Sequence, residues 1–218
     1  MVIEAPEEAA AGIAGPRPGQ AAPSFSARTT MGDVRLEDFH GRWLILFSHP
    51  ADFTPVCTSE FVALAKAAER FEAMNCGLLA LSVDSLFSHL AWVLSIEAQF
   101  DVRVAFPIIE DPSMAVARAY GMLDSDSGDS ATVRATYFID PGGIVRALTW
   151  YPMTNGRSVE EMLRLLAALQ ATDATGESTP AEWRPGEPLL APPPLTLEDA
   201  RRRARDTTSS WAYRGGAR

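Results

Sequence analysis

The residues best suited to chemistry lie in one stretch, SHPADFTPVCTSE at positions 48–60, which holds one of the chain's two cysteines. The apolar run WLILFS, at 43–48, predicts a buried strand that ends where this stretch begins. Apolar residues at helical spacing follow, with Thr54 as a candidate N-cap and Pro55 at the first helical position. Cys57 is therefore predicted in the first turn of a helix, where free N–H groups and the helix dipole stabilise an anion.

A cysteine in that position can react as a thiolate, which is the nucleophilic form of the side chain. A thiolate that reduces a peroxide needs a group to hold the substrate and a positive charge near the leaving oxygen. Thr54 can supply a hydroxyl one turn earlier, while Pro50 and Phe53 can cover the sulfur with apolar atoms. From the pattern alone, a small buried hydrophobe is an equally good interpretation of Cys57, because most free cysteines are buried.

The positive charge has to come from another part of the chain, and Arg134 is the strongest candidate because it interrupts the apolar strand pattern ATVRATYFI at 131–139. Strand alternation puts Arg134 on one face with Thr132 and Thr136, and that face could equally be exposed to solvent. The pattern does not decide between these two interpretations. His49 is interpreted, from the pattern, as a local hydrogen-bonding residue that closes the strand.

Composition limits the classes of function that need to be considered. Of the 218 residues, 47% are hydrophobic, which is enough for one sizeable core and a smaller extension. A net charge of −9 without a basic, aromatic-rich cluster before the far C-terminus argues against a nucleic-acid partner. The chain shows neither a secretion signal nor an apolar run long enough to span a membrane, so we expect a cytoplasmic protein without a membrane partner.

Strand and helix patterns alternate along the chain. They predict strands at 43–48, 78–83, 106–109, 132–139 and 144–151, and helices at about 54–74, 87–100, 113–120 and 158–171. The turn sequence DPGG at 140–143 predicts that the last two strands form a hairpin. These elements predict an α/β fold in which helices flank a mixed central sheet.

The two ends of the chain differ from this middle part. Residues 1–20 are rich in Ala, Gly and Pro and predict a flexible leader, with the folded part starting near Ala22. Beyond Thr172 the chain becomes polar and rich in proline, which predicts a separate C-terminal segment at 173–218. Within it, Thr196 predicts a helix start, and the arginines of RRRAR at 201–205 favour a solvated helix face over an anion-binding patch.

The pattern Pro50-x-x-x-Thr54-x-x-Cys57 resembles the active-site signature of the peroxiredoxins, which are thiol peroxidases with a thioredoxin-like fold. Similarity to the one-cysteine, peroxiredoxin-six type subfamily covers about residues 20–212. It is carried by FSHPADFTPVCTSE (47–60), LALSVDS (79–85), HLAW (89–92), FPIIED (106–111), GMLD (121–124), YPMTNGRS (151–158) and TPAEWRPGE (179–187).

The resemblance implies a role for each matching residue. Cys57 would be the peroxidatic cysteine, and the Thr54 hydroxyl would position the peroxide. Pro50 would shield the sulfur, while the Arg134 guanidinium would favour the thiolate and bind a peroxide oxygen. The supporting polar positions of the family match His49, Glu60 and Arg157. The resemblance also implies a thioredoxin-like peroxidase domain at 21–172 and a small C-terminal one-cysteine peroxiredoxin domain at 173–218.

The activity implied is the reduction of hydrogen peroxide and small organic hydroperoxides by Cys57, which would cycle between thiolate and sulfenic acid. An external thiol, either a small molecule or a redox protein, would recycle it, and the chain would form a homodimer or a larger homo-oligomer. Neither a cofactor nor a metal is expected, and His40, His49 and His89 show no ligand-like spacing. The stretch FHGRWL at 39–44 lacks the serine of the family's phospholipase members, so no phospholipase activity is expected.

Three alternatives remain open from the sequence. A two-cysteine mechanism would use Cys76, but the predicted helix of about 18 residues separates it from Cys57 by about 27 Å, so burial of Cys76 is favoured. A redox sensor would pass the oxidation of Cys57 to a protein partner. A holdase-like chaperone would instead act through exposed apolar surface.

Overall fold

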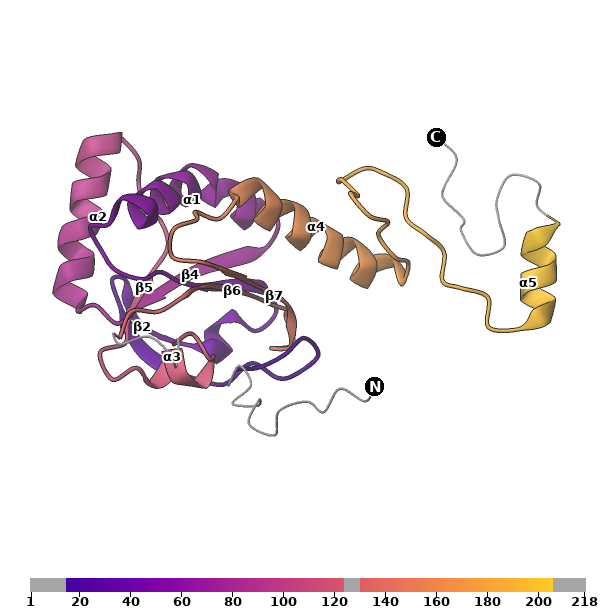
Figure 1. The fold of residues 1–218 in the computed structure, drawn as a ribbon, viewed down its shortest axis with the longest axis horizontal. Helices are drawn as coiled ribbons and strands as arrows, with labels where there is room; N and C mark the ends of the chain where they lie inside the picture. The colour runs from indigo at the N-terminus through magenta and orange to yellow at the C-terminus, as the bar shows by residue number, and fades with distance from the viewer. Residues whose placement is uncertain (1–14, 124–129, 206–218) are drawn as a thin grey trace, which may run out of the picture. The chain divides into compact units, whose positions relative to one another are not determined.

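The computed structural model describes residues 15–123 and 130–205. It divides after Val159 into two compact units, each of which is described by itself. The first unit contains a seven-stranded mixed sheet with the order β2-β1-β5-β4-β3-β6-β7 (Figure 1). The predicted α/β fold with a mixed central sheet is therefore confirmed.

The sheet combines a parallel centre with antiparallel edges. Its strands are β1 (Ser26–Thr29), β2 (Gly32–Arg35), β3 (Trp43–Ser48), β4 (Cys76–Ser82), β5 (Ile108–Glu110), β6 (Arg134–Ile139) and β7 (Val145–Tyr151). β3 pairs with β4 in parallel and with β6 in antiparallel orientation, and β6 and β7 form the predicted hairpin. Every residue of β3 and β6 is buried, because helices cover both faces of the sheet there.

Helices lie on both faces of this sheet (Figure 1). Those of the first unit are the 3-10 helix η1 (Leu36–Phe39), α1 (Pro55–Ala73), α2 (Leu86–Phe100) and α3 (Ala115–Ala119). Because side chains alternate along β3, Leu44 and Leu46 face the α3 side, while Phe47 packs edge-on against Phe61 of α1. The sheet therefore has two separate apolar layers.

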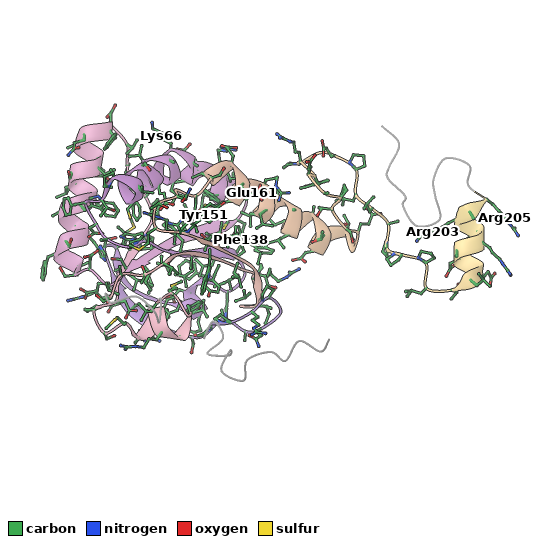
Figure 2. All side chains as sticks on the ribbon, viewed as in Figure 1. Lys66, Phe138, Tyr151, Glu161, Arg203 and Arg205 are labelled. Carbon is green, nitrogen blue, oxygen red and sulfur yellow. The ribbon has the colours of Figure 1, made fainter. Side chains whose placement is uncertain are left out.

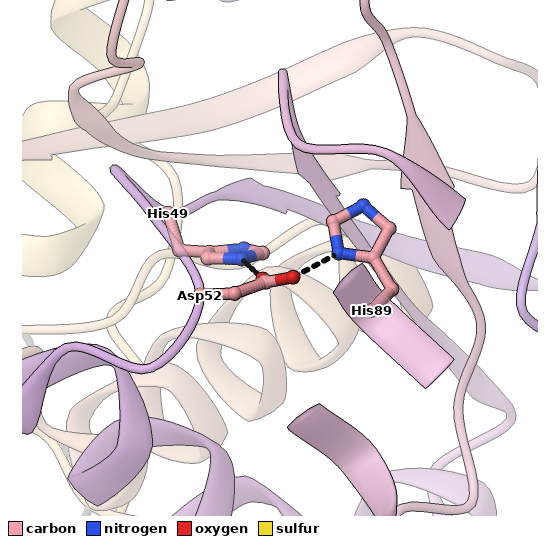
Figure 3. Close-up of side chains that lie close together, drawn as sticks. All are labelled: His49, Asp52 and His89. Atoms are coloured by element: carbon pink, nitrogen blue, oxygen red, sulfur yellow. Dashed lines mark hydrogen bonds and ion pairs between the residues drawn. The ribbon is translucent and has the colours of Figure 1, made fainter. Parts of the chain in front are cut away.

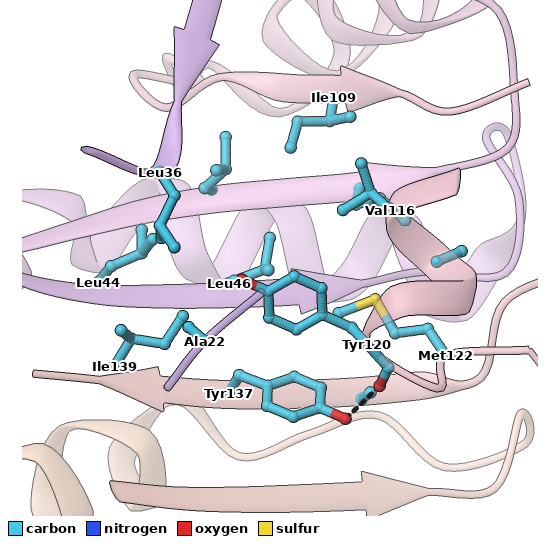
Figure 4. Close-up of a cluster of buried hydrophobic side chains, with 14 of the residues drawn as sticks. Ala22, Leu36, Leu44, Leu46, Ile109, Val116, Tyr120, Met122, Tyr137 and Ile139 are labelled. Carbon is cyan, nitrogen blue, oxygen red and sulfur yellow. Dashed lines mark hydrogen bonds between the residues drawn. The ribbon is translucent and has the colours of Figure 1, made fainter. Parts of the chain in front are cut away.

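The α3 side holds a cluster of buried aliphatic residues around two tyrosines (Figure 4). Tyr137 of β6 donates a hydrogen bond to the carbonyl oxygen of Tyr120, just after α3, and the two rings pack edge-to-face. The α1 side is instead aromatic, with the rings of Phe47, Phe61 and Trp92 packed in series. The functional residues of the sequence motif lie on this aromatic side.

The second unit contains α4 (Val159–Thr175) from its second residue onward and α5 (Leu197–Ala204), joined by the proline-rich segment. Trp183 is buried there, and its indole N–H donates to the carbonyl oxygen of Glu187. Thr196 caps α5 as predicted. Arg202 pairs with Asp199 one turn earlier, and Arg203 and Arg205 lie at the end of α5 (Figure 2), which agrees with a solvated helix face.

The N-terminal part of the fold differs from the sequence prediction in two respects. The folded part begins before Ala22, because backbone hydrogen bonds tie residues 19 and 20 to β7. The Gly19 N–H donates to the Val145 carbonyl oxygen, and the Val145 N–H donates to the Gln20 carbonyl oxygen. Residues 1–14 of the expected leader lie outside the described residues. β1 and β2 were not predicted, since each has only four residues and β2 is mostly exposed.

A search of the helices in the described ranges finds none that is long and apolar enough to cross a membrane.

Candidate active site

Cys57 lies where the sequence predicts it, in the first turn of α1. Thr54 is the N-cap residue with extended backbone angles, and Pro55 occupies the first helical position. The Thr54 hydroxyl does not cap the helix; it donates to the Ala51 carbonyl oxygen at 2.9 Å, which fixes its direction. The Cys57 side chain is completely buried, so a reactant has to enter the protein to contact its sulfur.

Arg134 is buried against the cysteine. The residue is 2% exposed, and its Nη1 lies 3.3 Å from the Cys57 sulfur. Nε and Nη2 both donate to the Met153 carbonyl oxygen, at 2.9 and 2.8 Å, which holds the guanidinium plane in place. The solvent-facing interpretation of Arg134 is therefore wrong, because β6 lies between β3 and β7 and α1 covers this face.

Glu60 lies one turn after Cys57 in α1 and binds two arginines. Its Oε1 accepts from the backbone N–H and Nε of Arg157, and its Oε2 accepts from Arg157 Nη2 and Arg134 Nη1, all at 2.8–2.9 Å. Burial by itself would raise the pKa of Glu60, but hydrogen bonds from Arg157 and the charges of both arginines lower that pKa below its ordinary value of 4.5. Glu60 is therefore ionised at neutral pH.

The charges of this group do not cancel. Arg134 and Arg157 contribute two positive charges and Glu60 one negative charge, and all three side chains are 3% exposed. One buried positive charge remains, and Arg134 directs a nitrogen at the sulfur. The Arg134 guanidinium is therefore placed to be the counter-charge of a thiolate at Cys57.

Pro50 and Phe53 were both predicted to cover the sulfur. Pro50 is buried, whereas Phe53 is 57% exposed and has a positive φ of 58°. The Phe53 ring packs 6.5 Å from the Trp92 ring, and both line a shallow pocket of about 140 Å³ that also includes Thr58, the residue after Cys57. Covering of the sulfur by either residue stays a prediction.

His49 belongs to a second buried group that the sequence analysis missed (Figure 3). Asp52 accepts a hydrogen bond from His49 Nε2 at 2.9 Å and from His89 Nδ1 at 2.8 Å. Burial lowers the pKa of His49 below its usual 6.5 in spite of the opposing effect of Asp52. Burial by itself would raise the pKa of the Asp52 carboxyl, but the hydrogen bonds from the two histidines outweigh burial and hold that pKa well below its ordinary value.

His49 and His89 lie close together in the fold, although their spacing in the sequence shows no ligand pattern. With Asp52 they bring three ligand-type atoms within 4.8 Å of one another, the spacing of a possible metal site among the described residues. The outward nitrogens, His49 Nδ1 and His89 Nε2, are buried without partners. Metal-bound histidines almost always donate from that second nitrogen, so the group fits a hydrogen-bonded cluster better than a metal centre.

Cys76 lies far from this site along the fold. It is the first residue of β4, paired in register with the first residue of β3, whereas Cys57 follows the last residue of β3. Both cysteines are free and buried, and burial raises the pKa of Cys76 to about 12. The thiol of Cys76 is therefore the unreactive, protonated form.

The structure brings together most of the site residues expected from the sequence. Cys57, Glu60, Arg134 and Arg157 form one contact group, with Thr54 at the start of the same helix. The Met153 carbonyl oxygen, which binds Arg134, and Asp52 of the second buried group were missed. Asp52 lies within the motif itself, but its partner His89 is 37 residues away, and no local signal connects them.

Comparisons with known proteins agree with this geometry. Residues 18–148 match the AhpC/TSA family, and residues 168–207 match the C-terminal domain of 1-Cys peroxiredoxin. A peroxiredoxin of Aquifex aeolicus is 49% identical over 203 residues, covering 88% of this chain and 91% of that protein. Peroxiredoxin 2 of Picrophilus torridus is 44% identical over 193 residues, covering 88% and 95%.

Solved structures show the same relationship. A yeast mitochondrial 1-Cys peroxiredoxin, studied for thiol resolution via glutathione/thioredoxin systems, superposes with a TM-score of 0.78 at 40% identity, over 85% of this chain and 91% of that one. A cysteine-to-serine mutant of peroxiredoxin 6 from Arenicola marina gives 0.82 at 30% identity, over 94% and 100%.

The chain therefore belongs to the peroxiredoxin family, the thiol peroxidases with a thioredoxin-like fold. Its C-terminal match and these two structures confirm the resemblance to the one-cysteine, peroxiredoxin-six type.

Proposed function

We propose that this chain reduces hydrogen peroxide and small organic hydroperoxides through Cys57 alone. The thiolate attacks one peroxide oxygen, an S–O bond forms and the O–O bond breaks. With one proton taken up, the products are Cys57 sulfenic acid and water or an alcohol. An external thiol then reduces the sulfenic acid through a mixed disulfide, which a second thiol resolves to restore Cys57.

The observation that carries this proposal is the buried group of two arginines and one glutamate beside Cys57. Its remaining positive charge can pair with the thiolate that attacks the peroxide. In the transition state the same Arg134 nitrogens can stabilise the charge that develops on the peroxide oxygens. The hydroxyl of Thr54, at the start of the same helix, is the group we assign to holding the peroxide.

The other site residues support these two. Glu60 and Arg157 orient Arg134 through the bonds described above. His49 contributes a buried nitrogen without a partner on the same side of the sheet, and Pro50 is assigned to restricting access to the sulfur. No cofactor or metal is part of the proposal.

The burial of Cys76 supports a one-cysteine cycle, because a protonated thiol at the opposite end of β3 cannot resolve the sulfenic acid without unfolding. We therefore propose a small thiol or a thioredoxin-type protein as the reductant. We also propose a cytoplasmic homodimer or larger homo-oligomer, with a peroxidase domain at 21–172 and a C-terminal domain at 173–218.

Steady-state peroxide consumption with dithiothreitol as the electron donor tests the proposal. Cys57→Ser should lose turnover and keep its circular dichroism spectrum, while Cys76→Ser should turn over like the wild type. Turnover that survives Cys57→Ser would refute the peroxidase assignment. Loss of turnover in Cys76→Ser would establish a two-cysteine cycle instead.

If the wild type is oxidised at Cys57 but no thiol recycles it, the redox-sensor alternative gains support. A mixed disulfide trapped on one protein partner would then identify that partner. Suppression of client aggregation that is independent of Cys57 would point to the chaperone alternative.

A further inference from the structure

The group of His49, Asp52 and His89 is buried, yet the proposed reaction makes no use of Asp52 or His89. Asp52 uses both carboxylate oxygens to accept one hydrogen bond from each histidine (Figure 3). Its backbone N–H also donates to Asp84 after β4, at 2.9 Å. The loop before α1 is thus fixed to α2 through His89 and to the end of β4 through Asp84.

An ionised carboxylate accepts hydrogen bonds and donates none, so the ring nitrogen that faces it must carry the hydrogen. His49 therefore has its hydrogen on Nε2. Because burial keeps His49 neutral, its Nδ1 has a free lone pair, and this atom is buried without any partner. Asp52 thus determines which His49 nitrogen is the acceptor.

The sheet register places that acceptor on the catalytic side. The antiparallel pairing of Phe47 with Thr136, continued by two residues, sets His49 opposite Arg134. The Thr132 hydroxyl donates to the His49 carbonyl oxygen at 2.7 Å, so the two segments still lie side by side there. Residues in opposite positions of an antiparallel pair project from the same face of the sheet.

Contacts with α1 agree with this placement. The His49 ring packs edge-on against Phe61, with 5.0 Å between ring centroids. Phe61 is one turn after Cys57 on the buried face of α1, next to Glu60, which binds Arg134. His49 and Arg134 therefore approach the same helix face from neighbouring positions.

We propose that Asp52 is a positioning residue for the peroxidase reaction: its carboxylate fixes the tautomer of His49, whose bare Nδ1 accepts a hydrogen bond from the O–H of the peroxide bound at Cys57. This role rests on the proposed function. It gives the otherwise unpartnered nitrogen a partner during the reaction, and it orients the hydrogen-bearing peroxide oxygen. His89 keeps the second oxygen of Asp52 occupied and so holds the carboxylate in place.

Nuclear magnetic resonance of the reduced, ¹⁵N-labelled full chain tests the tautomer directly. The chain has only three histidines, and spectra of His40→Gln and His89→Gln assign them. Two-bond ¹H–¹⁵N spectra should show His49 with the hydrogen on Nε2 and a bare Nδ1 at pH 7. A hydrogen on Nδ1, alone or together with one on Nε2, would overturn the proposal.

Asp52→Asn tests the functional part, because an amide accepts with one end and donates with the other and cannot bind both histidines in their present tautomers. We expect the rate constant for Cys57 oxidation by hydrogen peroxide to fall about 10- to 100-fold, with an altered histidine spectrum. Asp101→Asn is the matched control. Asp101 is exposed at the end of α2 and has left-handed backbone angles that asparagine also adopts, so this variant should leave the rate unchanged.

A folded Asp52→Asn protein that oxidises within twofold of the wild type would refute the inference. Should that variant not fold, His49→Phe replaces it, because phenylalanine keeps the packing on Phe61 and lacks Nδ1; an unchanged rate there would equally refute it. The wild-type rate is measured in the same series. If the wild type itself is not oxidised at Cys57, the proposed function fails and not the assignment of Asp52.

Discussion

At the scale of single residues, the chemistry of this peroxiredoxin depends on a buried positive charge that has no counter-charge of its own. Arg134 and Arg157 share Glu60, and the remaining positive charge adjoins the sulfur of Cys57. Such a buried group costs free energy to assemble and is stable only when every polar atom has a partner. Four hydrogen bonds to one carboxylate meet that requirement.

Arg134→Lys keeps the charge but removes the planar group that binds Met153, Glu60 and Cys57 at once. We expect the rate constant for Cys57 oxidation to fall at least about 10-fold, because one donor to the developing oxyanion is lost. Stopped-flow tryptophan fluorescence measures it. Arg146→Lys, at a partly exposed arginine of β7, is the control. Equal rates for Arg134→Lys and the wild type would show that charge alone suffices.

Glu60→Gln should destabilise the fold by about 3–5 kcal/mol, because it leaves two buried arginines without their counter-charge. Urea unfolding at pH 7 measures the loss. Glu161→Gln breaks an exposed pair with Arg164 and should cost about 1 kcal/mol or less. Similar losses in both variants would contradict the distinction between the buried and the exposed pair.

At the scale of elements, α1 and β3 together separate the two cysteines. α1 starts after the last residue of β3 and contains Cys57 in its first turn, whereas Cys76 is paired with the first residue of β3. The two cysteines therefore have different surroundings. Cys57 adjoins the Arg134 guanidinium, whereas burial is the largest influence on the pKa of Cys76.

Cys76 should therefore resist alkylation in the native protein at pH 8. With a pKa of about 12, only about one molecule in ten thousand carries the thiolate at that pH. Iodoacetamide treatment followed by peptide mass spectrometry measures the labelling, and the urea-unfolded chain, in which Cys76 should react readily, is the control. Rapid labelling of native Cys76 would mean that β4 opens easily.

The elements also show what the sequence could and could not predict. The start of α1 was predicted to the residue, because Thr54 and Pro55 are strong local signals. The β6–β7 hairpin followed from its turn sequence. By contrast, the exposure of Arg134 depends on which strands flank β6, and strand alternation contains no information about that.

Long-range partners mark the same limit at the site. Cys57 was identified by its motif, and Arg134 became decisive only through the family resemblance. The contact between Asp52 and His89 joins a loop to a helix, and the spacing of the histidines gave no sign of it. Short, exposed β2 was missed because it has too few apolar residues to show a period.

At the scale of the whole molecule, buried carboxylates control the response to acid. Asp52 and Glu60 both have pKa values below their ordinary 3.8 and 4.5, so they bind protons more weakly in the folded state than in the unfolded state. Their contribution to stability is complete above those ordinary values and is lost as the pH falls through the lowered ones.

The free energy of unfolding contributed by these two groups should therefore be constant from pH 7 to about 5.5 and decrease below about pH 4.5. Urea titrations of the wild type and Glu60→Gln across this range measure it as a difference, because the lowered pKa of His49 reduces the stability of both proteins alike below about pH 6.5. The difference in the free energy of unfolding between the wild type and Glu60→Gln should become smaller as the pH falls below about 4.5. A difference that stays constant down to pH 3 would contradict the assignment of Glu60 as ionised in the fold.

One rapid-mixing experiment shows whether Cys57 alone is the peroxidatic residue. Reduced protein is mixed with substoichiometric hydrogen peroxide, then treated with dimedone, and each cysteine is analysed by mass spectrometry. We expect fast oxidation with a sulfenic-acid adduct on Cys57 and none on Cys76. Slow oxidation, or a disulfide between Cys57 and Cys76, would contradict it.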